Sequence, residues 1–246
     1  MSNYFDLPFI PERPGKPRNK GVTMVMDKGL SLKQAENVID NSANLIDMVK
    51  MGFGTACISN KIELKIRLYK EAGINVYPGG TLFEAFLVRG MVDEYCRMVE
   101  KLKLEMVEIS DGSICIQHHE KCKLIAKLSK HFTVLSEVGS KEEGIIIHPK
   151  KWISMMKTEL EAGSWKVIAE ARESGTVGIF RSSGHAHTVL IHRIVTAVDP
   201  DNIIWEAPQK SQQAWFINKF GANVNIGNVS MDDIIPLETL RLGLRG

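Results

Sequence analysis

The chain has 246 residues and a formal net charge of +2, from 31 lysines and arginines against 29 aspartates and glutamates. This balance provides no basic footprint for nucleic acid, and no apolar run approaches the roughly 20 residues that a membrane helix needs. Hydrophobic residues make up 44% and cysteines number four, so we expect a globular protein of the reducing cytoplasm rather than a disulfide scaffold.

The chain begins with a polar, proline-containing stretch over residues 1–20. This stretch lacks the apolar segment of a signal peptide. We interpret it as an arm that lies on the folded domain or reaches a neighbouring subunit of a homo-oligomer. Residues 21–246 are then expected to form one domain, since no linker interrupts them.

Eight short apolar runs follow in order, each of a length and composition typical of a strand. They cover residues 21–27, 45–50, 74–78, 106–110, 133–138, 166–172, 202–208 and 222–226. Predicted helices lie between them: residues 61–72 and 91–102 have apolar residues at helical spacing, and residues 151–162 follow Pro149, a residue type favoured at helix starts. Ser31 with Gln34, and Thr81 with Glu84, fit the capping-box pattern of helix starts.

Strands that alternate with helices indicate parallel βαβ units. Eight units of about 30 residues match the size of a (β/α)8 TIM barrel. An open doubly wound sheet is the alternative, and the lack of a dinucleotide glycine fingerprint after the first strand disfavours it.

Four consecutive predicted strands carry a glutamate in their second half: Glu108, Glu137, Glu170 and Glu206. Because side chains alternate along a strand, sending the apolar neighbours outward turns these glutamates into the barrel mouth. Asp27 and Lys50 end the first two strands, and we expect them at the same mouth.

A ring of carboxylates must be protonated, paired with basic groups or bound to a divalent cation. Internal ion pairs with Lys50, Lys141 and Arg172 are the simpler interpretation for any one glutamate. For the whole set we favour a functional site, because charges buried only for structure are costly and barrel enzymes keep their sites at this end.

Gly79, Gly80 and Thr81 follow the third strand and are candidates for binding an anion through backbone amides at a helix start. A tight turn is the structural alternative. Lys210 and Ser211 follow the seventh strand, where Ser211 is a candidate N-cap.

Asn228 follows the eighth predicted strand. Because barrel phosphate sites often use the loops after strands seven and eight, we expect Lys210, Ser211 and Asn228 to contact substrate.

Lys141 lies just after Gly139, which allows a sharp exit from the fifth strand and places this lysine over the mouth as a candidate proton donor. A surface lysine is the alternative. Residues 175–188 are rich in glycine and serine and are interpreted as a mobile lid. Cys115, His118, His119 and Cys122 lack a distant second ligand pair, so we expect no zinc site there.

Nine ordered motifs resemble the phosphosulfolactate synthase family, which includes plant heat-stress-associated homologues. They are KPRNKGVT (16–23), MDKGL (26–30), DMVKMGFGT (47–55), VYPGGTLFE (76–84), VEISDG (107–112), EVGSK (137–141), EARESG (170–175), EAPQKSQ (206–212) and LETLRLGLR (237–245). The resemblance runs from about residue 16 to the C-terminus, and most of the motifs fall at predicted strand ends.

The resemblance implies a lyase that uses Mg²⁺ to add sulfite to phosphoenolpyruvate, giving (2R)-2-O-phospho-3-sulfolactate. This reaction opens coenzyme M biosynthesis in methanogens and serves sulfolactate biosynthesis in some bacteria. On this resemblance Lys141 supplies the proton, and Lys50, Arg172 and Lys210 neutralise the anionic groups. Asp27, Glu108, Glu137 and Glu170 are the expected magnesium ligands.

Three other functions remain open from sequence. One is a barrel aldolase in which Lys50 or Lys141 forms a Schiff base. A second is a non-catalytic, stress-associated relative, although such a protein would be expected to have lost its mouth charges. A third is the same type of reaction with a nucleophile other than sulfite.

Overall fold

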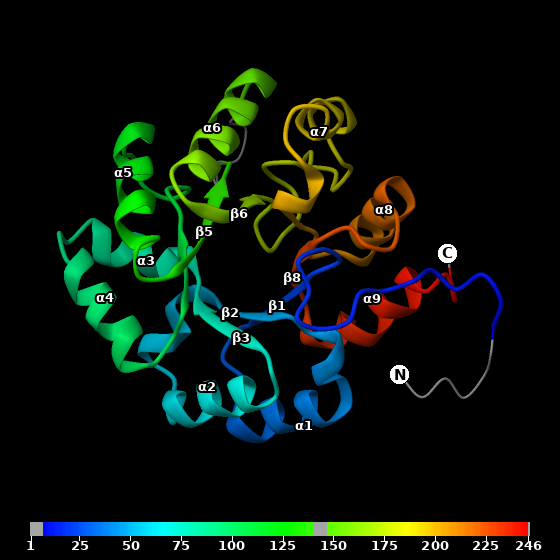
Figure 1. The fold of residues 1–246 in the computed structure, drawn as a ribbon, viewed down its shortest axis with the longest axis horizontal. Helices are drawn as coiled ribbons and strands as arrows, with labels where there is room; N and C mark the ends of the chain where they lie inside the picture. Colours follow the sequence, from blue (N-terminus) through cyan, green and yellow to red (C-terminus); the bar gives the residue numbers. More distant parts are fainter. Residues whose placement is uncertain (1–6, 140–146, 246) are drawn as a thin grey trace.

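The computed structural model describes residues 7–139 and 147–245, which fold into a ring of helices around a cylinder of parallel strands (Figure 1). The strands are β1 (Thr23–Asp27), β2 (Met48–Met51), β3 (Asn75–Pro78), β4 (Met106–Ile109), β5 (Thr133–Val138), β6 (Ser164–Ala169), β7 (Ile203–Glu206) and β8 (Ile226–Val229).

An α-helix or helix pair follows each strand on the outside of this cylinder. The helices are α1 (Leu32–Ser42), α2 (Ile62–Glu71), α3 (Gly80–Leu87), α4 (Val92–Lys101), α5 (His118–Leu128), α6 (Pro149–Glu161), α7 (Thr188–Val195), α8 (Lys210–Phe220) and α9 (Ile234–Arg241). Short 3-10 turns lie at Ala43–Leu45, Gly52–Cys57, Pro200–Asn202 and Met231–Asp233.

The hydrogen-bonded order of the strands is β3-β2-β1-β8-β7-β6-β5-β4. Every neighbouring pair is parallel, and the order brings the two ends of the sheet, β3 and β4, together at one seam. At this seam the amide of Gly80 donates to Oε1 of Glu108 at 2.6 Å. The predicted single (β/α)8 barrel is confirmed, and the alternative prediction of an open doubly wound sheet is wrong.

Two apolar layers arise because successive strand residues face opposite sides. The layer inside the barrel contains Met24, Met48, Leu135 and Ile168 among its members. The larger layer lies between strands and helices. The inner layer fills the barrel below the charged residues, so the polar site is confined to the carboxyl ends of the strands.

Several predicted boundaries shift in the structure. The fifth strand lies where predicted, and Ser31 with Gln34 forms the predicted capping box. The eighth strand, predicted at 222–226, instead begins at Ile226. The prediction missed most of it because the strand contains Gly227 and Asn228, two residue types of low strand propensity. Thr81 does not cap a helix, since α3 begins at Gly80.

Residues 7–20 lie beside the amino ends of the strands. Arg13 pairs with Glu238 of α9 at 3.1 Å, and Arg18 pairs with Asp47, just before β2, at 3.2 Å. In Figure 1 this segment runs next to α9. Over the described part of the chain, none of the helices combines the length and apolar character needed to cross a bilayer.

Candidate active site

A cavity of about 450 Å³ opens at the carboxyl ends of the strands. The lining residues used below are Lys50, Gly79, Thr81, Glu137, Glu170, Arg172, Glu206 and Asn228. Most of these residues are charged or polar and come from strands or loops far apart in the sequence. This position is the one in which barrel enzymes carry out their chemistry.

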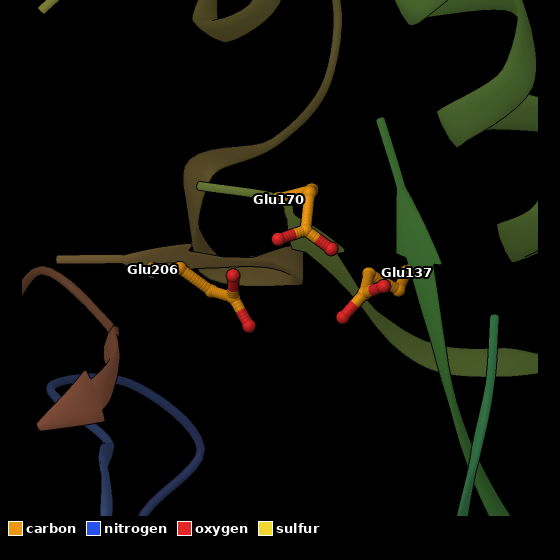
Figure 2. A group of neighbouring side chains, drawn as sticks. All are labelled: Glu137, Glu170 and Glu206. Carbon is orange, nitrogen blue, oxygen red and sulfur yellow. The ribbon is translucent and has the colours of Figure 1, made fainter. Parts of the chain in front are cut away.

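Three carboxylates converge in this cavity. Glu137 lies on β5, Glu170 directly follows β6, and Glu206 ends β7. One carboxylate oxygen from each lies within 4.8 Å of the others, and all three residues are buried. Figure 2 shows the three side chains turned toward a common space.

Lys50 of β2 neutralises part of this cluster. Its Nζ atom lies 3.0 Å from Glu108 Oε1, 3.2 Å from Glu206 Oε1 and 3.5 Å from Glu137 Oε2. The side chain is only 8% exposed. One ammonium group thus contacts three carboxylates that come from three different strands.

The local electrostatics follow from burial and this crowding. Burial alone would lower the pKa of Lys50, but the carboxylates of Glu108, Glu206 and Glu137 raise that pKa well above its usual value. Burial raises the pKa of Glu108 to about 7; the positive charge of Lys50 opposes this rise, while Glu137 and Glu206 add to it. Lys50 therefore keeps its charge at neutral pH, and Glu108 can hold a proton there.

The two glycines after β3 let the third and fourth strands approach closely. A Cβ atom at Gly80 would stand 2.3 Å from Ser110 Oγ and 2.8 Å from Glu108 Oε1, and one at Gly79 would stand 3.1 Å from Lys50 Cε. The Gly80 amide, predicted to bind a substrate anion, donates instead to Glu108. Gly79 and the exposed Thr81 line the cavity.

Asp27, a predicted magnesium ligand, lies outside this cluster. Its carboxylate is 2.8 Å from Lys65 Nζ and accepts a hydrogen bond from Tyr69, both on α2. The physical reason is strand alternation, because Asp27 shares a register row with the outward-facing Met51, whereas its neighbour Met26 shares a row with Lys50. Position at a strand end alone did not decide the side to which this aspartate points.

Arg172 and Asn228 also line the cavity. Arg172 lies after β6 rather than in the strand, and Asn228 lies in β8 rather than after it. Both residues adopt a left-handed backbone, with φ of 54°. The Arg172 amide donates to the Glu170 carboxylate. The Oδ1 atom of Asn228 is buried without a hydrogen-bond partner among the described residues, so it is available for a ligand group.

The structure does not bring Lys210 and Ser211 to this cavity. Lys210 is exposed at the first position of α8, and Ser211 lines a different cavity together with Arg181 and His185. The prediction that Ser211 is an N-cap is wrong, because Gln209 caps α8. Lys141 lies outside the described residues.

Sequence reasoning placed Glu206 among the strand-end glutamates but left it out of the metal set, although it belongs to the converging three. It also missed Tyr77, whose hydroxyl is buried in the barrel without a described partner. Both residues can be found from the alternation of inward- and outward-facing residues along a strand. Tyr77 pairs in register with Lys50, and Glu206 lies two residues after the inward-facing Ile204.

The cysteine- and histidine-containing stretch begins α5. His118 Nε2 lies 3.2 Å from Glu159 Oε1 and 3.8 Å from Cys122 Sγ.

The stretch over residues 175–188, predicted to be a lid, is tied to α8 by Gln212, whose Nε2 atom donates to the carbonyls of Gly175 and Gly184. Its mobility stays a prediction.

A closed parallel barrel with ionisable groups converging at its mouth defines a (β/α)8-barrel enzyme. The comparisons identify the family within that class. Residues 11–246 match the (2R)-phospho-3-sulfolactate synthase family, and the chain belongs to this family.

Close relatives cover nearly the whole chain. A phosphosulfolactate synthase of Methanothermobacter thermautotrophicus is 40% identical over 99% of this chain and 96% of that relative. One of Bacillus subtilis is 41% identical over 96% and 95%, and one of Methanocaldococcus jannaschii is 43% identical over 92% and 93%.

Solved structures support the fold alone. A 3-hexulose-6-phosphate synthase superposes with a TM-score of 0.58 at 14% identity, covering 89% of this chain and 98% of that one. The carboxyl transferase domain of Rhizobium etli pyruvate carboxylase gives a TM-score of 0.62 at 11% identity, over 88% of this chain and 41% of that one.

Proposed function

We propose that this chain is a Mg²⁺-dependent phosphosulfolactate synthase that adds sulfite to phosphoenolpyruvate, forming (2R)-2-O-phospho-3-sulfolactate. Membership of the family over residues 11–246 supports this activity. The structural observation that carries the proposal is the convergence of Glu137, Glu170 and Glu206 beside Lys50 in the mouth cavity.

The three glutamates fit a magnesium ion. Mg²⁺ prefers oxygen ligands at about 2.1 Å, so opposite ligands lie about 4 Å apart. The carboxylate oxygens here lie within 4.8 Å of one another before any adjustment. Glu137, Glu170 and Glu206 would hold the ion. Glu108 would not bind the ion directly and instead pairs with Lys50 next to it.

The reaction joins two anions and needs positive charge to do so. The sulfur lone pair of sulfite attacks the methylene carbon, and the electrons of the carbon–carbon double bond move toward the carboxylate. Bound Mg²⁺ would act as a Lewis acid that offsets the negative charge on that carboxylate. A proton then reaches the carbon that bears the phosphate.

The chain's own residues bind and orient the reactants in this proposal. Lys50 neutralises the surrounding glutamates. Arg172 neutralises an anionic group of the substrates, and the side-chain NH2 group of Asn228 donates to one of the substrate oxygens. Lys210 and Ser211 have no part in it, since they lie away from the cavity. Lys141 remains our proton donor on the family resemblance.

The activity is tested by mixing purified protein with phosphoenolpyruvate, sulfite and Mg²⁺ and following products by phosphorus NMR. We expect a phosphosulfolactate signal that disappears when any one component is omitted and returns when Mg²⁺ is restored after chelation. Product formation with sulfite replaced by another nucleophile, but not with sulfite, would reject the substrate assignment.

Lys141→Ala is expected to remove turnover while sparing phosphoenolpyruvate binding, because the proton donor is lost but the anion-binding groups remain. Single-turnover kinetics and calorimetric titration with phosphoenolpyruvate measure the two effects. Retained turnover would assign the proton to another group.

The geometry disfavours a Schiff-base aldolase that uses Lys50. Such a lysine must lose its proton to attack a carbonyl, whereas Glu108, Glu206 and Glu137 raise its pKa well above the usual value. Borohydride trapping of a Lys50 adduct in chelated protein would contradict this argument. A non-catalytic role is disfavoured because the cavity keeps three glutamates together with Lys50 and Arg172.

We also propose a cytoplasmic homo-oligomer. The four cysteines are free, which suits a reducing compartment. Phe9 in the N-terminal segment is 99% exposed, and Ile58 is 81% exposed, so both offer apolar surface for a second copy. Light scattering of the purified protein, with and without residues 1–9, tests the assembly.

A further inference from the structure

Lys121 of α5 is a fully buried cation with three partners on three different segments. Its Nζ atom donates to Asp111 Oδ1 at 2.8 Å and to the backbone carbonyl of Glu137 at 2.5 Å, and lies 3.0 Å from Glu159 Oε1. An ammonium group has three N–H donors, so these contacts use all of them. The side chain is 0% exposed.

The contact with Glu137 falls where the sheet ladder ends. The last register pair of β4 with β5 is Ile109 with Ser136. Glu137 is the next residue on β5, beyond the last pair with β4, and its carbonyl accepts a hydrogen bond from Lys121. The end of β5 is therefore held by β6 through Val138 and Ala169, and by the Lys121 side chain through Glu137.

The contacts with Asp111 and Glu159 fix the position of the Lys121 ammonium group. Glu159 is buried on α6, and Asp111 lies in the β4–α5 loop, whose Ser113 lines the mouth cavity. Lys121 thus joins a strand end, an active-site loop and an outer helix. A shift of its ammonium group would move the backbone from which the Glu137 carboxylate projects.

We propose that Lys121 is a positioning residue for the divalent-cation site, which it serves by fixing the end of β5 so that Glu137 stands opposite Glu170 and Glu206. This inference rests on the proposed function, because it takes the three glutamates to be metal ligands. Groups that orient metal ligands without touching the metal typically change its affinity by about 10- to 100-fold when they are removed.

A purely structural ion pair is the competing interpretation, and the chain contains a matched control for it. Lys65 of α2 is also buried; it lies 2.8 Å from Asp27 and donates to the carbonyl of Leu30 at 2.8 Å. Both lysines tie an outer helix to the carboxyl end of a strand. Only the partners of Lys121 include one of the three glutamates.

The test compares Lys121→Met with Lys65→Met, using Mn²⁺ as the probe and counting the free ion by electron paramagnetic resonance without substrate. Urea unfolding of the metal-free proteins measures the stability lost in each. We expect Lys121→Met to raise the Mn²⁺ dissociation constant about 10-fold or more, and Lys65→Met to leave it within about twofold at a similar loss of stability.

Lys121→Met leaves the buried Glu159 without its lysine partner and could unfold the protein, so a second variant is needed. Lys121→Met with Glu159→Gln removes both charges, and we expect the same weakening of Mn²⁺ binding. Wild-type affinity in this folded double variant would overturn the role of Lys121 alone. A wild-type protein whose Mn²⁺ binding is absent, or unaffected by Glu137→Gln, would overturn the metal site and this inference together.

Discussion

At the scale of single residues, the direction of each side chain decides its role. Asp27 and Glu206 both end a strand, yet Glu206 joins the carboxylate cluster and Asp27 pairs with Lys65 outside the barrel. The difference is one of parity, because adjacent strand residues face opposite sides. A carboxylate at a strand end is therefore a metal candidate only when it faces inward.

This difference predicts opposite outcomes for two conservative variants. Glu206→Gln should weaken Mn²⁺ binding by about 10-fold or more, since one anionic ligand is lost. Asp27→Asn should leave the affinity within about twofold but lower the stability, because it breaks the buried pair with Lys65. Metal titration and urea unfolding measure the two effects, and a reversed pattern would return Asp27 to the metal site.

Glu108 predicts a pH dependence of stability. The pKa of Glu108 in the folded protein is about 7, above the ordinary value of 4.5. Between these two pH values the folded protein therefore keeps a proton on Glu108, whereas the unfolded chain has released it. Stability should therefore fall as the pH rises from about 4.5 to 7, by on the order of 3 kcal/mol, and not further above that. Glu108→Gln should remove this contribution in urea unfolding of chelated protein; an unchanged slope would contradict it.

At the scale of elements, the seam between β3 and β4 is joined through the site itself. The amide of Gly80 binds Glu108, and the hydroxyl of Ser110 donates to Glu84 of α3. The residues that hold the seam thus also orient Glu108 toward Lys50. Closure of the barrel and construction of the site depend on the same contacts.

Gly80→Ala should disturb both. The added Cβ would stand 2.3 Å from Ser110 Oγ and 2.6 Å from its Cβ, so we expect a loss of roughly 1–3 kcal/mol in unfolding free energy and lower turnover. Gly15→Ala is the control, because nothing lies within 4 Å of its added Cβ, and it should stay within about 0.5 kcal/mol. Equal stability of the two variants would show that the seam adjusts freely.

At the scale of the whole molecule, the two ends of the barrel have different tasks. The carboxyl end holds the cavity, whereas the N-terminal segment and α9 cover the amino end. Arg241 is fully buried there and donates to the carbonyls of Val224 and Val22. Stability and chemistry are thereby placed at opposite ends of the same strands.

Deleting residues 1–19 should therefore lower stability by several kcal/mol, because Glu238 and Asp47 lose their buried partners Arg13 and Arg18. Deleting only residues 1–9 keeps both arginines and should have little effect on the monomer. Urea unfolding at fixed protein concentration compares the two. A long deletion as stable as the short one would mean that the segment does not support the barrel.

Local sequence patterns are enough to predict the barrel, its strand positions to within a few residues and a gathering of charge at one end, because periodicity and βαβ alternation can be recognised in short segments. Tertiary structure alone decided which of those charges meet. Lys50 contacts glutamates from β4, β5 and β7, and Lys121 supports Glu137 from an outer helix. Such contacts depend on strand parity, register and helix packing, which bring together residues far apart in the chain.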